Sequence, residues 1–248
     1  MENRTIVLVG ATGKIGSNLA SCLDSKGFSL VLVGRSLEKL NKLADSFSSN
    51  RHTVEVIDFQ DGLEFIEPKI SAIAKKNSNV TSLIFASGTL QVIPFMQTTP
   101  KLWTESMNTN LFAAVECIKG FVRGSAADTP NKSIVLMSSV ASTGGQLGLS
   151  TYSSSKAALE SVAKSAAREL SRRKIRVNTV QFGLIPEGLG EEIQARVGQE
   201  NFKRLIDEYP LGQATASEAS KAAMFLISDQ ASWITGSNMV VDGGFSTR

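Results

Sequence analysis

Two side chains that could move a proton, Tyr152 and Lys156, stand four residues apart. The surrounding segment, YSSSKAALESVAKSAAREL, carries apolar and small residues at helical spacing, so both should project from one face near the start of a helix. A free tyrosine has a pKa of about 10, but a fixed ammonium group nearby favours the phenolate and lowers that pKa. The pair is therefore a candidate for acid–base catalysis, although this spacing alone more often lines a solvated helix edge.

A third candidate is Ser139, which also carries a hydroxyl group. It ends the strand-like run SIVLMSS, thirteen residues before the tyrosine. If folding brings Ser139 beside Tyr152, its hydroxyl adds a hydrogen-bond donor for a carbonyl oxygen. The three side chains could then polarise a carbonyl group and deliver a proton to it.

The chain opens with a strand-like run at residues 5–9, followed by a glycine-rich loop and a helix beginning near residue 15. Glycines in this context let the backbone approach a pyrophosphate, and the helix N-terminus supplies unpaired N–H donors. The alternative is that the glycines only make a tight turn. The candidate cofactor residues of this loop are Gly10, Thr12, Gly13, Lys14, Ile15 and Gly16.

Together these stretches resemble the classical short-chain dehydrogenase/reductase family, and the resemblance covers essentially the whole chain. The family's catalytic serine, tyrosine and lysine match Ser139, Tyr152 and Lys156 in type and spacing. Asn110 matches the family asparagine that distorts its helix and holds a water next to the lysine. The resemblance implies that Ser139 polarises a carbonyl, Tyr152 donates the proton, and Lys156 lowers the tyrosine pKa and bonds the cofactor ribose.

The end of the second strand, VLVGRS, bears on the choice of cofactor. An acidic residue there accepts from a ribose 2′-hydroxyl and repels a 2′-phosphate, whereas an arginine can clamp the phosphate. Gly34 occupies the acidic position and Arg35 follows it, so the resemblance implies NADP(H), with assistance from Ser36 and Lys14. A solvated arginine at a strand end is the alternative.

The resemblance places further cofactor contacts after later strands, at Asp58, Phe59, Ala86, Ser87, Gly88, Gly183 and Ile185. Two departures from the family pattern accompany them. The segment Phe85–Gly88 replaces an Asn-Asn-Ala-Gly motif, and one interpretation is that Ser87 takes over part of the missing asparagine bonding. Glu187 stands where the family has a threonine. Because its charge and that of a pyrophosphate repel, we expect either that this carboxylate points away from the pyrophosphate or that the loop takes another course.

Strand-like runs alternate with helical segments along the whole chain, which predicts one α/β domain over residues 1–248 with a doubly wound, seven-stranded parallel sheet and helices on both faces. The hydrophobic content of 42% is enough for a sizeable core. A polar, charged stretch at about 184–210 is expected to form a substrate lid. The predicted strands are 5–9, 30–33, 53–57, 82–86, 133–137, 175–180 and 238–242.

Composition argues against several function classes. The net charge of +3 is spread without a long basic run, so we expect no nucleic-acid partner. No segment approaches 18 unbroken apolar residues, so we expect no membrane span and a cytoplasmic protein. Cys22 and Cys117 lack the spacing of a metal site and are expected to be core thiols. His52, the only histidine, is expected on the surface and outside any Ser-His-Asp triad or metal site.

The helices around 103–121 and 151–172 carry more apolar or small residues than one buried face requires. In the family these helices and the C-terminal region, here 233–245, form subunit interfaces, so we expect a homotetramer, with a dimer as the fallback. Three functions remain open: a reductase of a small-molecule ketone or aldehyde, a non-catalytic NADP(H) sensor, and a sugar-nucleotide epimerase. Among reductases, the stretches SVASTGGQLGLSTYSSSKAAL and IRVNTV are most similar to 3-oxoacyl-[acyl-carrier-protein] reductases.

Overall fold

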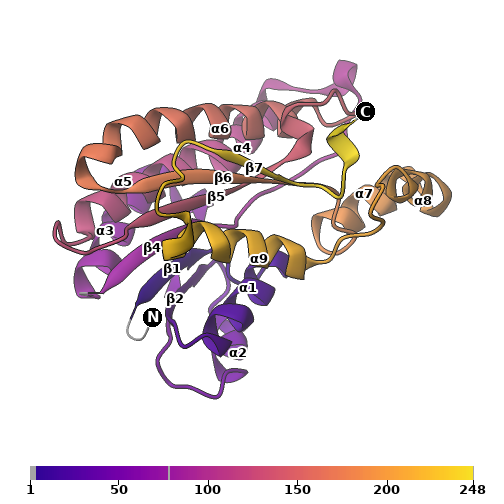
Figure 1. Cartoon of the computed structure of the whole chain (residues 1–248). Helices are drawn as coiled ribbons and strands as arrows, with labels where there is room; N and C mark the ends of the chain where they lie inside the picture. Colours follow the sequence, from indigo (N-terminus) through magenta and orange to yellow (C-terminus); the bar gives the residue numbers. More distant parts are fainter. Residues whose placement is uncertain (1–3, 78, 248) are drawn as a thin grey trace.

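The computed structural model describes residues 4–77 and 79–247, and its described strands form one parallel sheet in the order β3-β2-β1-β4-β5-β6-β7 (Figure 1). Every neighbouring pair is parallel. The seven-stranded Rossmann-like fold predicted from the alternation of strands and helices is confirmed. The strands are β1 (Thr5–Val9), β2 (Ser29–Gly34), β3 (Thr53–Val56), β4 (Val80–Phe85), β5 (Ser133–Ser139), β6 (Arg176–Phe182) and β7 (Asn238–Val241).

Helices cover both faces of the sheet and divide the core into two layers. One layer packs α3 (Ile66–Lys76), α5 (Ala113–Gly124) and α6 (Ser150–Leu170) against the strands. The other packs α1 (Lys14–Ser25), α2 (Leu37–Asp45) and α9 (Ala216–Ile227) on the opposite face (Figure 1). Because both faces are covered, β1, β2 and β4 to β6 are almost entirely buried, which explains their near-continuous apolar sequences.

The strand order reverses between β1 and β4, and this switch point positions the ends of both strands for a ligand. Gly10, directly after β1, has a φ of +83°, and a Cβ added there would lie 2.6 Å from the Ser87 amide nitrogen. Only glycine allows the two chain segments to approach this closely. The loops that follow β1 and β4 are thereby held against each other.

The long helix predicted after Pro100 is interrupted. It forms α4 (Pro100–Met107), then a π-helical turn at Asn108–Phe112, then α5. The wider turn contains Asn110, so the expected distortion of the helix at this asparagine is confirmed.

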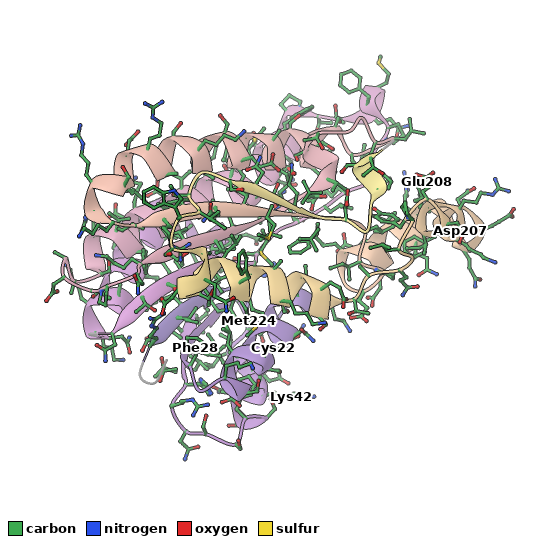
Figure 2. All side chains as sticks on the ribbon, in the orientation of Figure 1. Cys22, Phe28, Lys42, Asp207, Glu208 and Met224 are labelled. Carbon is green, nitrogen blue, oxygen red and sulfur yellow. The ribbon has the colours of Figure 1, made fainter. Side chains whose placement is uncertain are left out.

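The predicted lid region contains two short helices, α7 (Leu189–Val197) and α8 (Gln199–Asp207). They extend beyond one end of the sheet, where Asp207 and Glu208 are labelled in Figure 2. Most of their side chains are exposed or only partly buried. The assignment of these helices as a substrate lid stays a prediction.

The expectation that His52 lies on the surface is wrong. Its imidazole is 1% exposed, because it packs edge-on against Phe47 and accepts a hydrogen bond from the Leu30 amide through Nδ1. Ser49 and Asp24 both contact the other ring nitrogen, Nε2, at 3.1 and 2.9 Å. A catalytic triad needs the serine and the carboxylate on opposite nitrogens, so this cluster ties β2 to its flanking segments and does not form a triad.

The two cysteines are free thiols: Cys117 is buried on α5, which raises its pKa, and Cys22 is partly buried on α1. Within residues 4–77 and 79–247, no helix is both long enough and apolar enough to cross a bilayer.

Candidate active site

The first turns of α6 present Tyr152 and Lys156 to the protein interior. The two residues are 8% and 3% exposed, so they do not line a solvated helix edge. The Lys156 Nζ atom donates a hydrogen bond to the Met137 carbonyl oxygen at 2.8 Å and lies 5.7 Å from the centroid of the Tyr152 ring. Strand β5 therefore fixes the ammonium group, and the helix fixes the phenol beside it.

Ser139, the last residue of β5, completes the group. Its hydroxyl is hydrogen-bonded to Tyr152 and accepts from the Ala141 amide at 3.2 Å, within a short turn at Val140–Ser142. The three side chains singled out in the sequence are therefore brought together. A carbonyl oxygen placed here would meet two hydroxyl groups.

Burial sets the protonation of this site. It raises the pKa of Tyr152 to about 12, because desolvation of the phenolate outweighs the hydrogen bond with Ser139. The expectation of a lowered tyrosine pKa is therefore wrong in this structure, because burial outweighs the interactions that favour the phenolate. Burial also lowers the pKa of Lys156 to about 8, opposed by the negative charge of Glu160. At neutral pH the site holds a protonated tyrosine, which is the form that can donate a proton.

Asn110 connects the π-helical turn to the rest of the site. Its Oδ1 accepts from the Thr89 amide at 2.8 Å, and its Nδ2 donates to the Thr89 carbonyl and to Ser155 Oγ, both at 2.9 Å. A Cβ at Gly88 would lie 3.3 Å from Asn110 Oδ1 and 3.4 Å from Lys156 Nζ. Asn110 and Lys156 thus face the same glycine, and Asn110 fixes the loop after β4.

The glycine loop leaves a helix N-terminus without internal caps. Gly13 is the N-cap of α1, no side chain caps the helix, and its first turn contains no acidic residue. A Cβ at Gly16 would collide with the Gly10 carbonyl oxygen, whereas one at Gly13 would meet nothing closer than 3.4 Å. Gly16 is therefore required for packing, and the exposed Gly13 backbone is open to a ligand. These features fit a pyrophosphate group.

The flanking loop residues lie on different sides of this opening. Lys14 is exposed, and its Cγ lies 3.0 Å from a Cβ built at Gly188, so it contacts the loop before α7. Thr12 faces the end of β2, with its Oγ1 3.5 Å from a Cβ built at Gly34. Ile15 is partly buried among core residues.

Arg35 is exposed directly after β2 and has no ion-pair partner in the described part of the chain. It can meet a phosphate there. Ser36 caps α2: its hydroxyl oxygen accepts from the Lys39 amide at 3.3 Å, which leaves the hydroxyl proton available for donation to a phosphate.

Three further residues from the predicted cofactor site make contacts within the chain or lack an expected one. Asp58 caps the turn that follows β3 by accepting from the Gln60 amide at 3.0 Å. The Phe59 ring stacks on Phe85 at a centroid distance of 6.0 Å and packs against the core. The Ser87 hydroxyl makes no hydrogen bond to any residue that the structure describes, so Ser87 does not replace the asparagine bonding. The backbone of Ala86 is instead held by its amide, which donates to the Val9 carbonyl at 2.8 Å.

The loop after β6 is held by a residue that sequence reasoning missed, Tyr209. Its hydroxyl accepts from the Leu184 amide at 2.7 Å, and a Cβ at Gly183 would lie 2.6 Å from its ring. Ile185 is buried, and Glu187 is exposed as expected for a carboxylate turned away from a pyrophosphate. No local sequence pattern identifies Tyr209, because it reaches this loop from beyond α8.

A cleft of about 650 Å³ lies between residues 92–95, the loop at 145–150 and α7, and Ser139, Tyr152 and Lys156 are not among its lining residues. Val92 lines this cleft and also packs against the cluster that contains Tyr152. Arg196, on α7, is the one charged residue that lines it. Its other lining residues include Phe95, Gly148, Ser150 and Val197.

Comparison with known proteins shows the family of the chain. Residues 10–246 match the family model described as enoyl-(acyl carrier protein) reductase. The chain has the same fold as a short-chain type dehydrogenase/reductase from Mycobacterium ulcerans, with a TM-score of 0.91 and 25% identity over 100% of this chain and 91% of that chain. The chain belongs to the short-chain dehydrogenase/reductase family.

Two curated relatives are named as reductases of different substrates. The chain is 29% identical over 245 residues to the 3-oxoacyl-[acyl-carrier-protein] reductase FabG of Rickettsia conorii, covering 98% of this chain and 97% of that protein. It is 30% identical over 246 residues to L-xylulose reductase of Bos taurus, covering 99% and 97%. The NADP-bound structure of ElxO shares the fold at 24% identity, with a TM-score of 0.89 over 99% of this chain and 100% of that chain.

The family membership defines the chemistry in outline. This protein is an oxidoreductase that uses a nicotinamide dinucleotide and acts on a carbonyl/alcohol pair. The likeness to reductases favours an enzyme over the cofactor sensor considered from the sequence.

Proposed function

We propose that this protein reduces a ketone or aldehyde to an alcohol with NADPH, and that Tyr152 is the proton donor. The observation that carries the proposal is the convergence of Ser139, Tyr152 and Lys156 at the carboxyl end of β5, with the tyrosine held in its protonated form. A protonated phenol is what carbonyl reduction requires. The opposite direction needs the same group as a base.

Each side chain has one part in the reaction. The Ser139 and Tyr152 hydroxyls donate hydrogen bonds to the carbonyl oxygen, which polarises it, and Tyr152 then transfers its proton as negative charge develops there. The Lys156 ammonium lies under the phenol and stabilises the phenolate left behind. Asn110 keeps the loop after β4 in register and is proposed to connect Lys156 to solvent.

The residues that would hold the cofactor surround the switch point. The N–H groups of Gly13 and the first turn of α1 would bind the pyrophosphate, Arg35 the 2′-phosphate, and Tyr152 with Lys156 the nicotinamide ribose. NADPH supplies the hydride when bound. The choice of NADPH over NADH rests on Arg35, because no acidic residue occupies the end of β2.

The substrate is proposed to enter through the cleft between residues 92–95, the loop at 145–150 and α7. Its mostly apolar lining suits an alkyl or acyl chain, and Arg196 suits an acidic group on the same molecule. A 3-oxoacyl thioester carried by a phosphopantetheine arm has both features, and it is our first candidate.

The test is oxidation of NADPH, followed by absorbance, against acetoacetyl thioesters, diketones, quinones and sugars. We expect turnover with at least one carbonyl class and higher kcat/KM for its acidic members. The proposal would be contradicted if the protein bound NADPH but reduced no member of the panel and oxidised none of the matching alcohols. That result would favour the non-catalytic NADP(H) sensor.

We also propose a homotetramer in the cytoplasm, with a dimer as the fallback. Apolar side chains are exposed where the family's interfaces lie: Phe112 is 45% exposed at the π-helical turn, and Trp233 and Val240 are 98% and 48% exposed near the C-terminus. A second copy of the chain would cover these side chains.

A further inference from the structure

Glu160 is a buried carboxylate that the proposed mechanism does not use. It lies on α6 one turn after Lys156, just as Lys156 lies one turn after Tyr152, so the three residues share a helix face. The residue is only 6% exposed. Burying a carboxylate is unfavourable unless its oxygens are satisfied, so its position calls for a reason.

Four neutral polar side chains lie within hydrogen-bond distance of the two oxygens of Glu160. Oε1 accepts from Ser138 Oγ at 2.5 Å, Ser142 Oγ at 2.7 Å and Gln181 Nε2 at 2.9 Å. Oε2 accepts from Asn238 Nδ2 at 3.0 Å. A carboxylate ion is an acceptor at both oxygens, which is what this arrangement requires.

These donors join Glu160 to the segment that carries Ser139. Ser138 directly precedes Ser139, and Ser142 ends the turn that follows it. The Ser142 hydroxyl is within hydrogen-bond distance of both Glu160 and the Ser139 carbonyl oxygen, at 2.7 Å in each case. The carboxylate therefore fixes both ends of this turn, and with them the direction of the Ser139 hydroxyl.

Glu160 also supplies the negative charge nearest to Lys156 along their shared face. It makes no salt bridge with any residue in the described ranges, and the groups that face it from β5, the turn, β6 and β7 are all neutral. Tyr152 is the other titratable group on this face of α6. Burial lowers the pKa of Lys156 to about 8, and the charge of Glu160 opposes that fall.

We propose that Glu160 is a positioning residue, which acts as the buried counter-charge of Lys156 and as the anchor of the turn that carries Ser139. This rests on the proposed function only for the identity of the reaction. The spacing of Tyr152, Lys156 and Glu160 was visible in the sequence, but a glutamate one turn further along a helix is usually solvated.

The test is the substitution Glu160→Gln, which keeps the size of the side chain and one of its two acceptor oxygens but removes its charge. The Lys156 pKa should then fall by about one unit from about 8. The ammonium fraction at pH 8 would fall from about a half to about a tenth, so kcat should fall about fivefold at pH 8 and little at pH 6. Glu160→Asp keeps the charge. The pH at which its kcat decreases on the alkaline side should be the same as in the wild type, even if kcat is lower at every pH.

The matched control is Gln181→Leu, which removes a neutral donor from the same network. Gln181→Leu should lower kcat by the same factor at every pH, as a purely structural change would. If the kcat of Glu160→Gln falls at the same alkaline pH as that of the wild type, the counter-charge role of Glu160 is refuted.

A readout without turnover separates this inference from the proposed function. In protein labelled with [13C]lysine, the Lys156 Cε resonance, assigned by its absence in Lys156→Met, should titrate at a lower pH in Glu160→Gln than in the wild type. An unchanged midpoint refutes the inference even if no carbonyl substrate is found. If Glu160→Gln does not fold, Glu160→Asp and the pair Ser138→Ala/Ser142→Ala take its place; both keep the charge, so a shifted midpoint in either contradicts the assignment.

Discussion

Two glycines of the first loop should respond differently to substitution by alanine. Gly10→Ala should lower stability, whereas Gly13→Ala should mainly lower NADPH affinity. At Gly10 the backbone has a φ of +83°, which costs an L-residue about 1–2 kcal/mol. The new Cβ would lie 2.6 Å from the Ser87 amide nitrogen and 2.7 Å from the Ala86 carbonyl carbon, and these backbone atoms cannot rotate away as a side chain could. Such overpacking costs about 1–3 kcal/mol. Gly10→Ala should therefore lower the free energy of unfolding by about 2–5 kcal/mol.

Gly13→Ala is the matched change in the same loop. Gly13 has a φ of −72° that alanine adopts freely, and the nearest atom to its Cβ is 3.4 Å away. A poorer N-cap and a less flexible unfolded chain have opposite effects of similar size, so stability should change by less than about 1 kcal/mol. The added methyl group would instead occupy the space proposed for the pyrophosphate, and NADPH affinity should fall about tenfold or more, equivalent to about 1.4 kcal/mol.

Urea unfolding followed by circular dichroism measures the first effect, and titration of NADPH fluorescence measures the second. The m-value should stay constant across the three proteins, so that the midpoints report stability alone. Equal loss of stability in the two variants would refute the packing argument at Gly10. Full NADPH affinity in Gly13→Ala would show that the cofactor does not approach this part of the backbone.

Four other outcomes test the site and the assembly. Tyr152→Phe should remove most turnover and weaken NADPH binding far less, because the variant loses the proton donor but keeps the proposed phosphate contacts of α1 and Arg35; a variant that keeps its activity would exclude Tyr152 as the acid. Arg35→Ala should weaken NADPH binding by about 1.5–3 kcal/mol and barely change NADH binding, and equal losses in parallel titrations would show that Arg35 is structural. Because the pKa of Lys156 is lowered to about 8, its ammonium is present below that pH and lost above it, whereas Tyr152 stays protonated to about 12. Reductase activity should therefore fall as the pH rises past about 8, and not only as it rises past about 12. Activity that stays level from pH 7 to 10 would contradict this role for Lys156. Light scattering should report a tetramer or dimer, and a mass near 26.5 kDa would contradict both.

Much of the fold follows from local sequence patterns. The apolar runs identified all seven strands to within a few residues at each end. In β1, β2 and β4 to β6 the reason is that both faces of the sheet are buried, so a strand there needs no polar positions. Glycine spacing placed the loop before α1, and the four-residue spacing of Tyr152 and Lys156 placed both on one face of α6. These features depend on residues that are close together along the chain.

The outcomes that only the tertiary structure decided depend on neighbours that are distant along the chain. Phe59 packs its ring against the core and His52 is buried by contacts with α1 and β2, although each sequence context suggested another place. The pKa of Tyr152 was expected to fall with a lysine beside it, and it rises instead. Spacing shows which groups are near each other, but the cost of desolvating a charge depends on everything that excludes water from it, and that shell comes from segments throughout the chain.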